Sequence, residues 1–189
     1  MATLIHYNDY PCAFDLNLIR WERYGSGGVK ESDAETTVTG EPYILWIEYR
    51  MVLRAGDGIL FESEKDTTLI LEDIKQLIDD LRQMVQGERN KMAFDPMEPD
   101  FGLVIGKLTE SEASVRISSA AGIRAEILSQ VVNQSTDPSN QFDVMVWIDL
   151  QNQRSNCYGG YGPGLYFYVL APDIERFADE LQTELDALE

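Results

Sequence analysis

Nucleophilic catalysis and transition-metal binding need histidine and cysteine side chains, and this chain has few of either. Its single histidine is His6, and its two cysteines are Cys12 and Cys157. His6 and Cys12 have the residue types of a thiol nucleophile with its base, but nothing in their spacing is specific for that chemistry. The cysteines fit no CxxC or zinc spacing, which predicts two reduced thiols. We therefore expect no enzyme activity, no bound metal and no cofactor.

Carboxylates are so abundant in this sequence that a pair of them carries little information. Asp95, Glu98 and Asp100 lie close together in Phe-Asp-Pro-Met-Glu-Pro-Asp-Phe, and their oxygens are the ligands that magnesium or calcium would use. The two prolines in the same segment instead favour a rigid turn that leads into a strand at Phe101. We favour the turn, with the acids exposed.

A glycine-rich segment at 156–164 carries Tyr158 and Tyr161. It lacks the Lys-Ser/Thr of a phosphate-binding P-loop, and it leads into a strand and not a helix. It is either a plain hairpin connection or a binding loop, since tyrosines are common anchors of protein interfaces. Both interpretations stay open. The residues just after it, Tyr166 to Tyr168, are expected to pack in the core and across strands.

The charge balance excludes whole classes of function. The 189 residues include 33 Asp and Glu against 15 Lys and Arg, a formal net charge of −18. Coating DNA, RNA or an anionic membrane needs basic residues at the phosphates. No signal peptide is visible, and no apolar run approaches the ~20 residues of a membrane span. We expect one cytoplasmic domain over 1–189, without nucleic acid or membrane partners. The oligomeric state is not indicated.

Two amphipathic helices are predicted, at about 70–86 and 172–188. In the first, Leu71, Ile74 and Ile78 recur at steps of three and four, as one helix face requires. Pro172 suits the first position of the second helix. The apolar positions of that helix are Ile174, Phe177, Ala178, Leu181, Leu185 and Leu188.

Most other segments alternate between apolar and polar residues and read as strands. A long strand is expected at 43–54, an earlier one from Phe14 towards Trp21, and a hairpin partner at 59–63 after the Gly56–Gly58 turn. The further expected strands are 101–108, 113–118, 123–132, 142–150 and 165–170. The strand at 142–150 is apolar on both sides, so both faces are expected to be covered.

These elements predict an α+β fold. About eight strands with short links favour a mostly antiparallel sheet, sandwich-like or barrel-like, on which the two helices pack.

The polar face of the C-terminal helix holds the densest charge. Residues 172–189 contain seven acids and one arginine, which is a third of the net charge. Such a face would attract a basic partner and raise its association rate. The alternative is a solvated face that keeps the protein soluble. The expected partner-binding residues are Asp173, Glu175, Asp179, Glu180 and Glu184, together with Tyr158 and Tyr161.

Three blocks of the sequence occur in an order and spacing that are familiar. They are 71–81, 94–103 and 165–170, the last of which runs into the C-terminal helix. With them the chain resembles the WapI-type family of small bacterial immunity proteins, over about residues 43–188. The residues that stand where the family has its Phe…Glu-Pro…Phe segment are Phe94, Glu98, Pro99 and Phe101.

The resemblance implies a protein that acts by binding and has no catalytic pattern to transfer. It implies that the protein protects its own cell by sequestering a cognate toxin, with a basic nuclease domain as the expected kind. The segments 25–40 and 156–164 are not features of that family, and no motif defines the binding surface. The competing hypothesis is a small-molecule-binding domain or an enzyme, with a pocket lined by Trp46, Trp147 and the Tyr158–Tyr161 loop.

Overall fold

A computed structural model of the chain describes residues 1–7, 11–24, 44–63, 66–96, 101–108, 140–148 and 164–188. Within these ranges the chain forms nine strands and two helices, and its α+β class is confirmed. The strands are β1 (Ala2–Ile5), β2 (Cys12–Tyr24), β3 (Ile44–Ala55), β4 (Gly58–Glu62), β5 (Asp66–Ile70), β6 (Lys91–Phe94), β7 (Phe101–Lys107), β8 (Gln141–Ile148) and β9 (Gly164–Leu170). The helices are α1 (Leu71–Gln86) and α5 (Ala171–Leu188).

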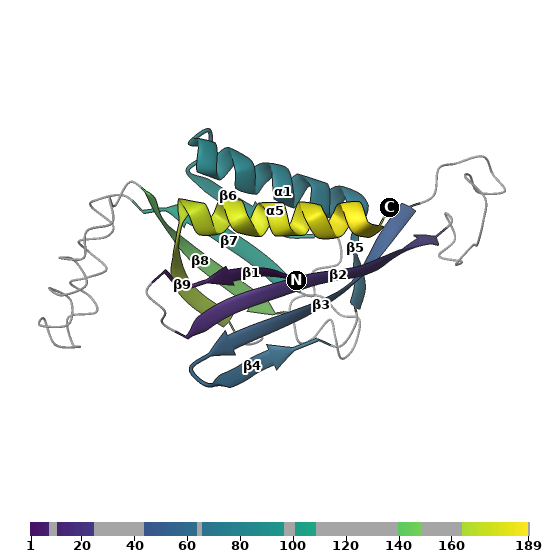
Figure 1. Ribbon diagram of the computed structural model, residues 1–189, viewed down its shortest axis with the longest axis horizontal. Helices are drawn as coiled ribbons and strands as arrows, with labels where there is room; N and C mark the ends of the chain where they lie inside the picture. The colour runs from purple at the N-terminus through teal and green to yellow at the C-terminus, as the bar shows by residue number, and fades with distance from the viewer. Residues whose placement is uncertain are drawn as a thin grey trace, which may run out of the picture.

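The strands form two antiparallel sheets, neither of which closes into a barrel among the described residues. The first sheet has the order β1-β2-β3-β4, with β5 pairing with the other end of β3. The second has the order β6-β7-β8-β9. Figure 1 shows β2 and β3 as the longest strands of the first sheet, running side by side. Their register shifts between Leu18 and Arg20, where β2 has a bulge.

Both helices begin directly at the end of a strand, and both use the same local device. The Asp73 carboxylate accepts a hydrogen bond from the Ile70 amide at 3.3 Å, and the Asp173 carboxylate accepts one from the Leu170 amide at 3.2 Å. Each aspartate thereby satisfies a backbone N–H at the helix start and places negative charge where the helix dipole favours it. α1 ends at Gly87, whose φ of 78° is in the left-handed region that favours glycine.

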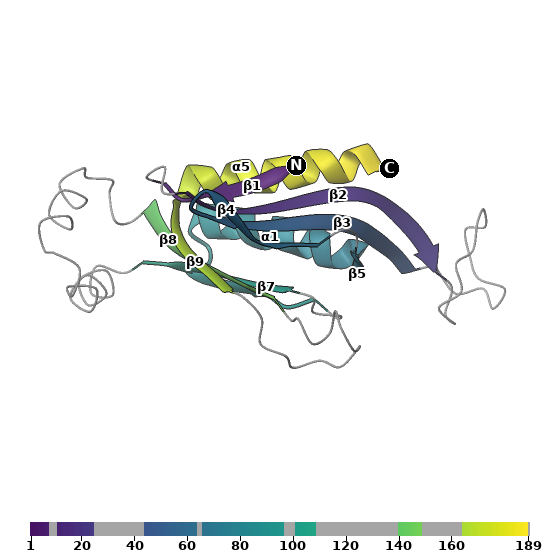
Figure 2. The ribbon, with the colours of Figure 1, turned by 90° about the horizontal axis from the view of Figure 1, so that it is seen from below.

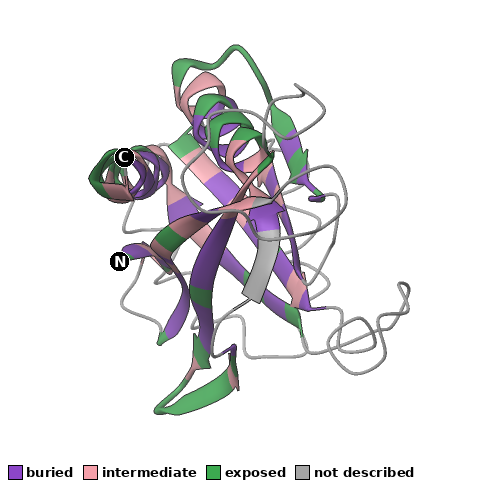
Figure 3. Cartoon of the chain, turned by 90° about the vertical axis from the view of Figure 1, so that its right-hand side faces the viewer, coloured by how far each residue is buried: buried purple, intermediate pink, exposed green. Residues whose placement is uncertain are grey.

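The core lies where the two sheets and the two helices meet. Figure 2 shows the second sheet below the first, while Figures 1 and 2 together show α1 and α5 side by side. One cluster of buried side chains draws on both sheets and both helices, and Figure 3 marks the buried residues of these elements in purple. Phe101 is central to it, because its ring lies 5.7 Å from the rings of Phe14, Tyr49 and Phe94.

Most of the predicted elements that fall on described residues are confirmed, including both helices. Three short strands, β1, β5 and β6, were missed. The expectation that the strand at 142–150 is covered on both faces is wrong. Its Val144 and Val146 side chains are buried, but Met145 is 44% exposed. In β9 Phe167 is buried as expected, whereas Tyr166 is 46% exposed. The expected strands at 113–118 and 123–132 lie outside the described residues.

Replacing Phe101 with alanine should destabilise the fold strongly. The change would leave a cavity between the two sheets, and large-to-small core substitutions of this kind cost about 3–5 kcal/mol. The matched control is Ile59→Ala on β4, because Ile59 is apolar but 60% exposed. Urea unfolding followed by tryptophan fluorescence would measure both free energies. Equal losses in the two variants would contradict the assigned core.

Candidate partner-binding surface

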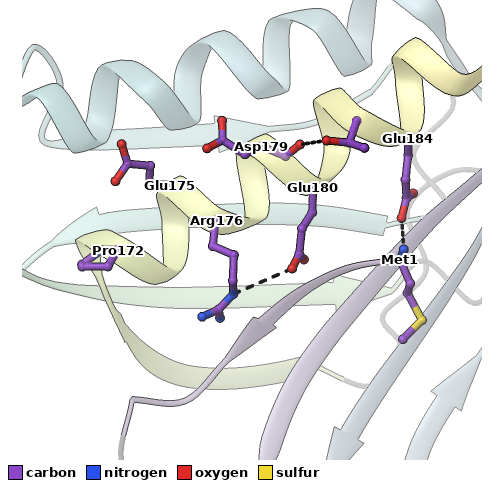
Figure 4. A pocket seen from close by; sticks show the side chains of 8 residues that line it. Met1, Pro172, Glu175, Arg176, Asp179, Glu180 and Glu184 are labelled. Atoms are coloured by element: carbon purple, nitrogen blue, oxygen red, sulfur yellow. Dashed lines mark hydrogen bonds and ion pairs between the residues drawn. The ribbon is translucent and has the colours of Figure 1, made fainter.

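The polar face of α5 borders a shallow, open groove of about 490 Å³ (Figure 4). Four of the five acids predicted on this helix line it, so the structure brings most of the sequence-predicted site together. The lining residues are Met1, Pro172, Glu175, Arg176, Asp179, Glu180, Thr183 and Glu184.

Two of these acids bind the backbone of the first sheet. Glu180 accepts a hydrogen bond from the Thr3 amide at 2.9 Å, and Glu184 accepts one from the Leu18 amide at 2.8 Å. β1 is the edge strand of its sheet, and its pairing with β2 ends at Ala2 opposite Leu16. Among the described residues, no strand therefore lies beside Thr3 or Leu18 on that side of the sheet. The Glu184 carboxylate also contacts the amino group of Met1. These two carboxylates therefore have a structural role.

The stripe of contacts continues to the end of the helix. The Trp21 indole N–H donates to the Leu188 carbonyl oxygen. Positions 180, 184 and 188 recur at steps of four, which places them on one face of a helix. Along this face α5 satisfies donors at the edge of the first sheet and blocks the pairing of further strands there.

The remaining predicted acids differ in their exposure and in the interactions that they already make. Asp173 caps the start of α5 and pairs with Arg176 at 3.1 Å. The side chain of Asp179 is 66% exposed and lies 3.4 Å from Arg82 of α1. Glu175 is exposed. Glu175 and Asp179 are thus the predicted acids that the structure leaves most available to a partner. Tyr158 and Tyr161 lie outside the described residues, so their role stays a prediction.

A second exposed surface, not predicted from the sequence, lies on the outer side of the second sheet. Tyr166 and Tyr168 alternate with the buried Phe167 and Val169, so both tyrosines face away from the core. The alternation of side-chain direction along a strand is the signal from which their exposure could have been predicted. Met145, on the neighbouring strand, pairs with Tyr166.

Of the two side chains considered for nucleophilic catalysis, Cys12 lacks the surroundings of an activated thiol. Cys12 is a free thiol in the core, and burial raises its pKa, whereas a nucleophilic cysteine needs a lowered one. Burial lowers the pKa of His6, whose ring stacks on Tyr7.

The acids considered as metal ligands are only partly described. No group of three or more His, Cys, Asp or Glu side chains within the described ranges is arranged to hold a metal ion. Asp95 is exposed, while Glu98 and Asp100 lie outside those ranges. Neither described helix is both long and apolar enough to cross a membrane.

Substitution of Glu184 by alanine should lower the free energy of unfolding by about 1–3 kcal/mol, because it leaves the Leu18 amide without its acceptor. Glu175→Ala removes the same charge from the same helix at an exposed site, and should change stability by less than about 0.5 kcal/mol. Chemical unfolding of the two variants in parallel measures the difference. If both variants are equally stable, the carboxylate of Glu184 has no structural role.

One comparison with known proteins identifies a family for this chain. A model of the immunity protein WapI-like family matches residues 6–189, a span that begins after β1 and includes all the other strands and both helices. No curated protein and no solved structure matches the chain. Because the family match covers nearly the whole chain, the protein belongs to the WapI-like immunity protein family.

Proposed function

We propose that the protein is a non-enzymatic inhibitor that binds a cognate toxin in the cytoplasm of the bacterial cell that makes both. The family match over residues 6–189 is the observation that carries this proposal, because immunity proteins act by neutralising a toxin. The described helices and strands all belong to one architecture built around one core cluster, which suits a protein that acts as a single rigid binding domain.

The charge of the chain supports a basic toxin, and a nuclease is the class we favour. A domain that grips nucleic-acid phosphates carries Lys and Arg on its active surface. A protein with a net charge of −18 attracts such a surface and competes for the same basic groups. On α5, the exposed Glu175 and Asp179 contribute to this attraction at distances up to about 8 Å at physiological salt.

The competing hypothesis of a ligand pocket between sheet aromatics gains no support from the described residues. Trp46 belongs to β3 in the first sheet, and Trp147 belongs to β8 in the second. Neither side chain lines the groove on α5. That groove is open, and four of its eight lining residues are acids, which is unlike the enclosed apolar pockets that hold small molecules.

We expect a toxin to be encoded beside this gene, and co-expression of this protein should restore growth of cells that the toxin alone arrests. The matched control is the Phe101→Ala variant, which keeps the charge but loses the core. It should protect poorly at a temperature where it is unfolded. Growth curves of cells that express the toxin with each variant give the comparison. Arrest of growth at full expression of the wild-type protein would overturn the proposal.

Reversing one exposed charge on α5 should slow the association with the toxin several-fold and flatten its salt dependence, because electrostatic attraction acts mainly on the association rate. Glu175→Lys makes this change without disturbing the hydrogen bonds to Thr3 and Leu18. Asp57→Lys, in the turn between β3 and β4, applies the same change in charge elsewhere. Stopped-flow binding at several salt concentrations would compare them. Equal rates for the two variants would show that α5 does not lie near the approach path.

A further inference from the structure

The outer surface of the second sheet carries a compact group of large side chains. On β8 and β9, Asp143 pairs with Tyr168 and Met145 pairs with Tyr166 in the antiparallel register. Trp147 follows on the same side of β8, opposite Gly164. We call this group the aromatic face. Its members are Asp143, Met145, Trp147, Tyr166 and Tyr168.

Two glycines of β7 leave space for side chains of the aromatic face to lie against the backbone of that strand. A Cβ atom added at Gly102 would lie 2.2 Å from the Trp147 ring, and one added at Gly106 would lie 2.5 Å from a carboxylate oxygen of Asp143. The indole and the carboxylate therefore rest directly on the backbone of the next strand. Side chains held in this way have few alternative rotamers, so a partner that binds them loses little conformational entropy.

The chemistry of the aromatic face matches that of interface anchors. The Tyr166 hydroxyl donates to Asp143 at 3.3 Å and lies 3.4 Å from the Tyr168 hydroxyl. The two tyrosine rings meet edge to face with centroids 5.4 Å apart. Met145 and Tyr166 are 44% and 46% exposed. Tyrosine, tryptophan and methionine are enriched at interfaces, where tyrosine and tryptophan dominate the binding energy.

We propose that the aromatic face is the surface on which the toxin docks, and that it receives an arginine or lysine side chain of the toxin. This inference rests on the proposed function. A cation placed there would lie beside the Asp143 carboxylate and against the electron-rich faces of the tyrosine rings.

Charge complementarity selects the toxin over a second copy of the chain. Two copies that each carry a net charge of −18 repel one another, whereas a basic protein is attracted. Lys91 lies in the same row of the sheet, across Gly106 from Asp143, and marks the basic border of the face on β6.

The outer face of α5 is a weaker candidate for the anchor. Glu180 and Glu184 already bind backbone amides of the first sheet, and Asp173 caps its own helix. The two surfaces therefore have separate tasks. The acids of α5 act on the approach of the toxin, and the aromatic face holds it after contact.

The test measures binding of the purified toxin domain, which we expect to be encoded beside this gene, to Tyr166→Ala and Met145→Ala. Each variant should bind about tenfold more weakly or worse, mainly through faster dissociation. Ile59→Ala is the matched control, because it removes an exposed apolar side chain from β4 of the other sheet, and it should bind within about twofold of wild type. Thermal unfolding checks that the variants keep their fold.

Asp143→Asn isolates the charge of the face. The amide keeps an oxygen that accepts from Tyr166 but lacks the negative charge. We expect weaker binding with a shallower dependence on salt, because one charge pair is lost. Unchanged affinity and salt dependence would overturn the proposed cation contact.

The outcomes distinguish a failure of the proposed docking surface from a failure of the proposed function. Wild-type affinity of Tyr166→Ala and Met145→Ala, with full protection of cells, would overturn the docking surface and leave the proposed function standing. Failure of the wild-type protein to bind the toxin would overturn both. A dimer that forms at higher protein concentration and is lost in Tyr166→Ala would identify the face as an interface between copies, which also overturns the proposal.

Discussion

The edge of the first sheet is the constraint on which the rest of this structure depends. β1 is short, and β2 extends well beyond it, so backbone N–H groups along that edge have no strand to pair with. Buried or half-buried amides without an acceptor are costly. The carboxylates of Glu180 and Glu184 supply the acceptors from α5, more than 160 residues later in the chain. The first and last elements of the fold are thus joined by charge-assisted hydrogen bonds.

This docking of α5 also positions the core. With its polar stripe on the sheet edge, the helix turns its apolar stripe inward, and the Phe177 ring lies 6.0 Å from that of Phe14. α1 packs beside α5, and Arg82 reaches Asp179 and Gln182 across the helix pair. The second sheet covers the remaining side of the core, where its Phe101 packs against Phe14. A helix that looked like a solvated acidic surface is therefore one of the main supports of the fold.

The division between supporting and exposed groups bears on how the protein recognises a toxin. Negative charge acts at a distance, so it favours encounter with a basic protein without defining where the complex forms. Short-range affinity needs rigid apolar and aromatic groups at the surface. The described residues offer such groups on β8 and β9, where two glycines let Trp147 and Asp143 lie against the sheet. In the proposed mode of binding, α5 contributes to the attraction and the aromatic face provides the anchor.

The sequence by itself determined the elements whose signal is local. Helical periodicity located α1 and α5, and period-two alternation located β2, β3, β7, β8 and β9, because side-chain direction repeats along a helix or strand. The strands β1, β5 and β6 have only 4 or 5 residues each, too few for alternation to stand out. Tertiary structure alone decided which face of β8 is covered and which acids are free. Identical carboxylates such as Glu175 and Glu184 differ only in the groups that folding brings beside them, and those groups come from distant parts of the chain.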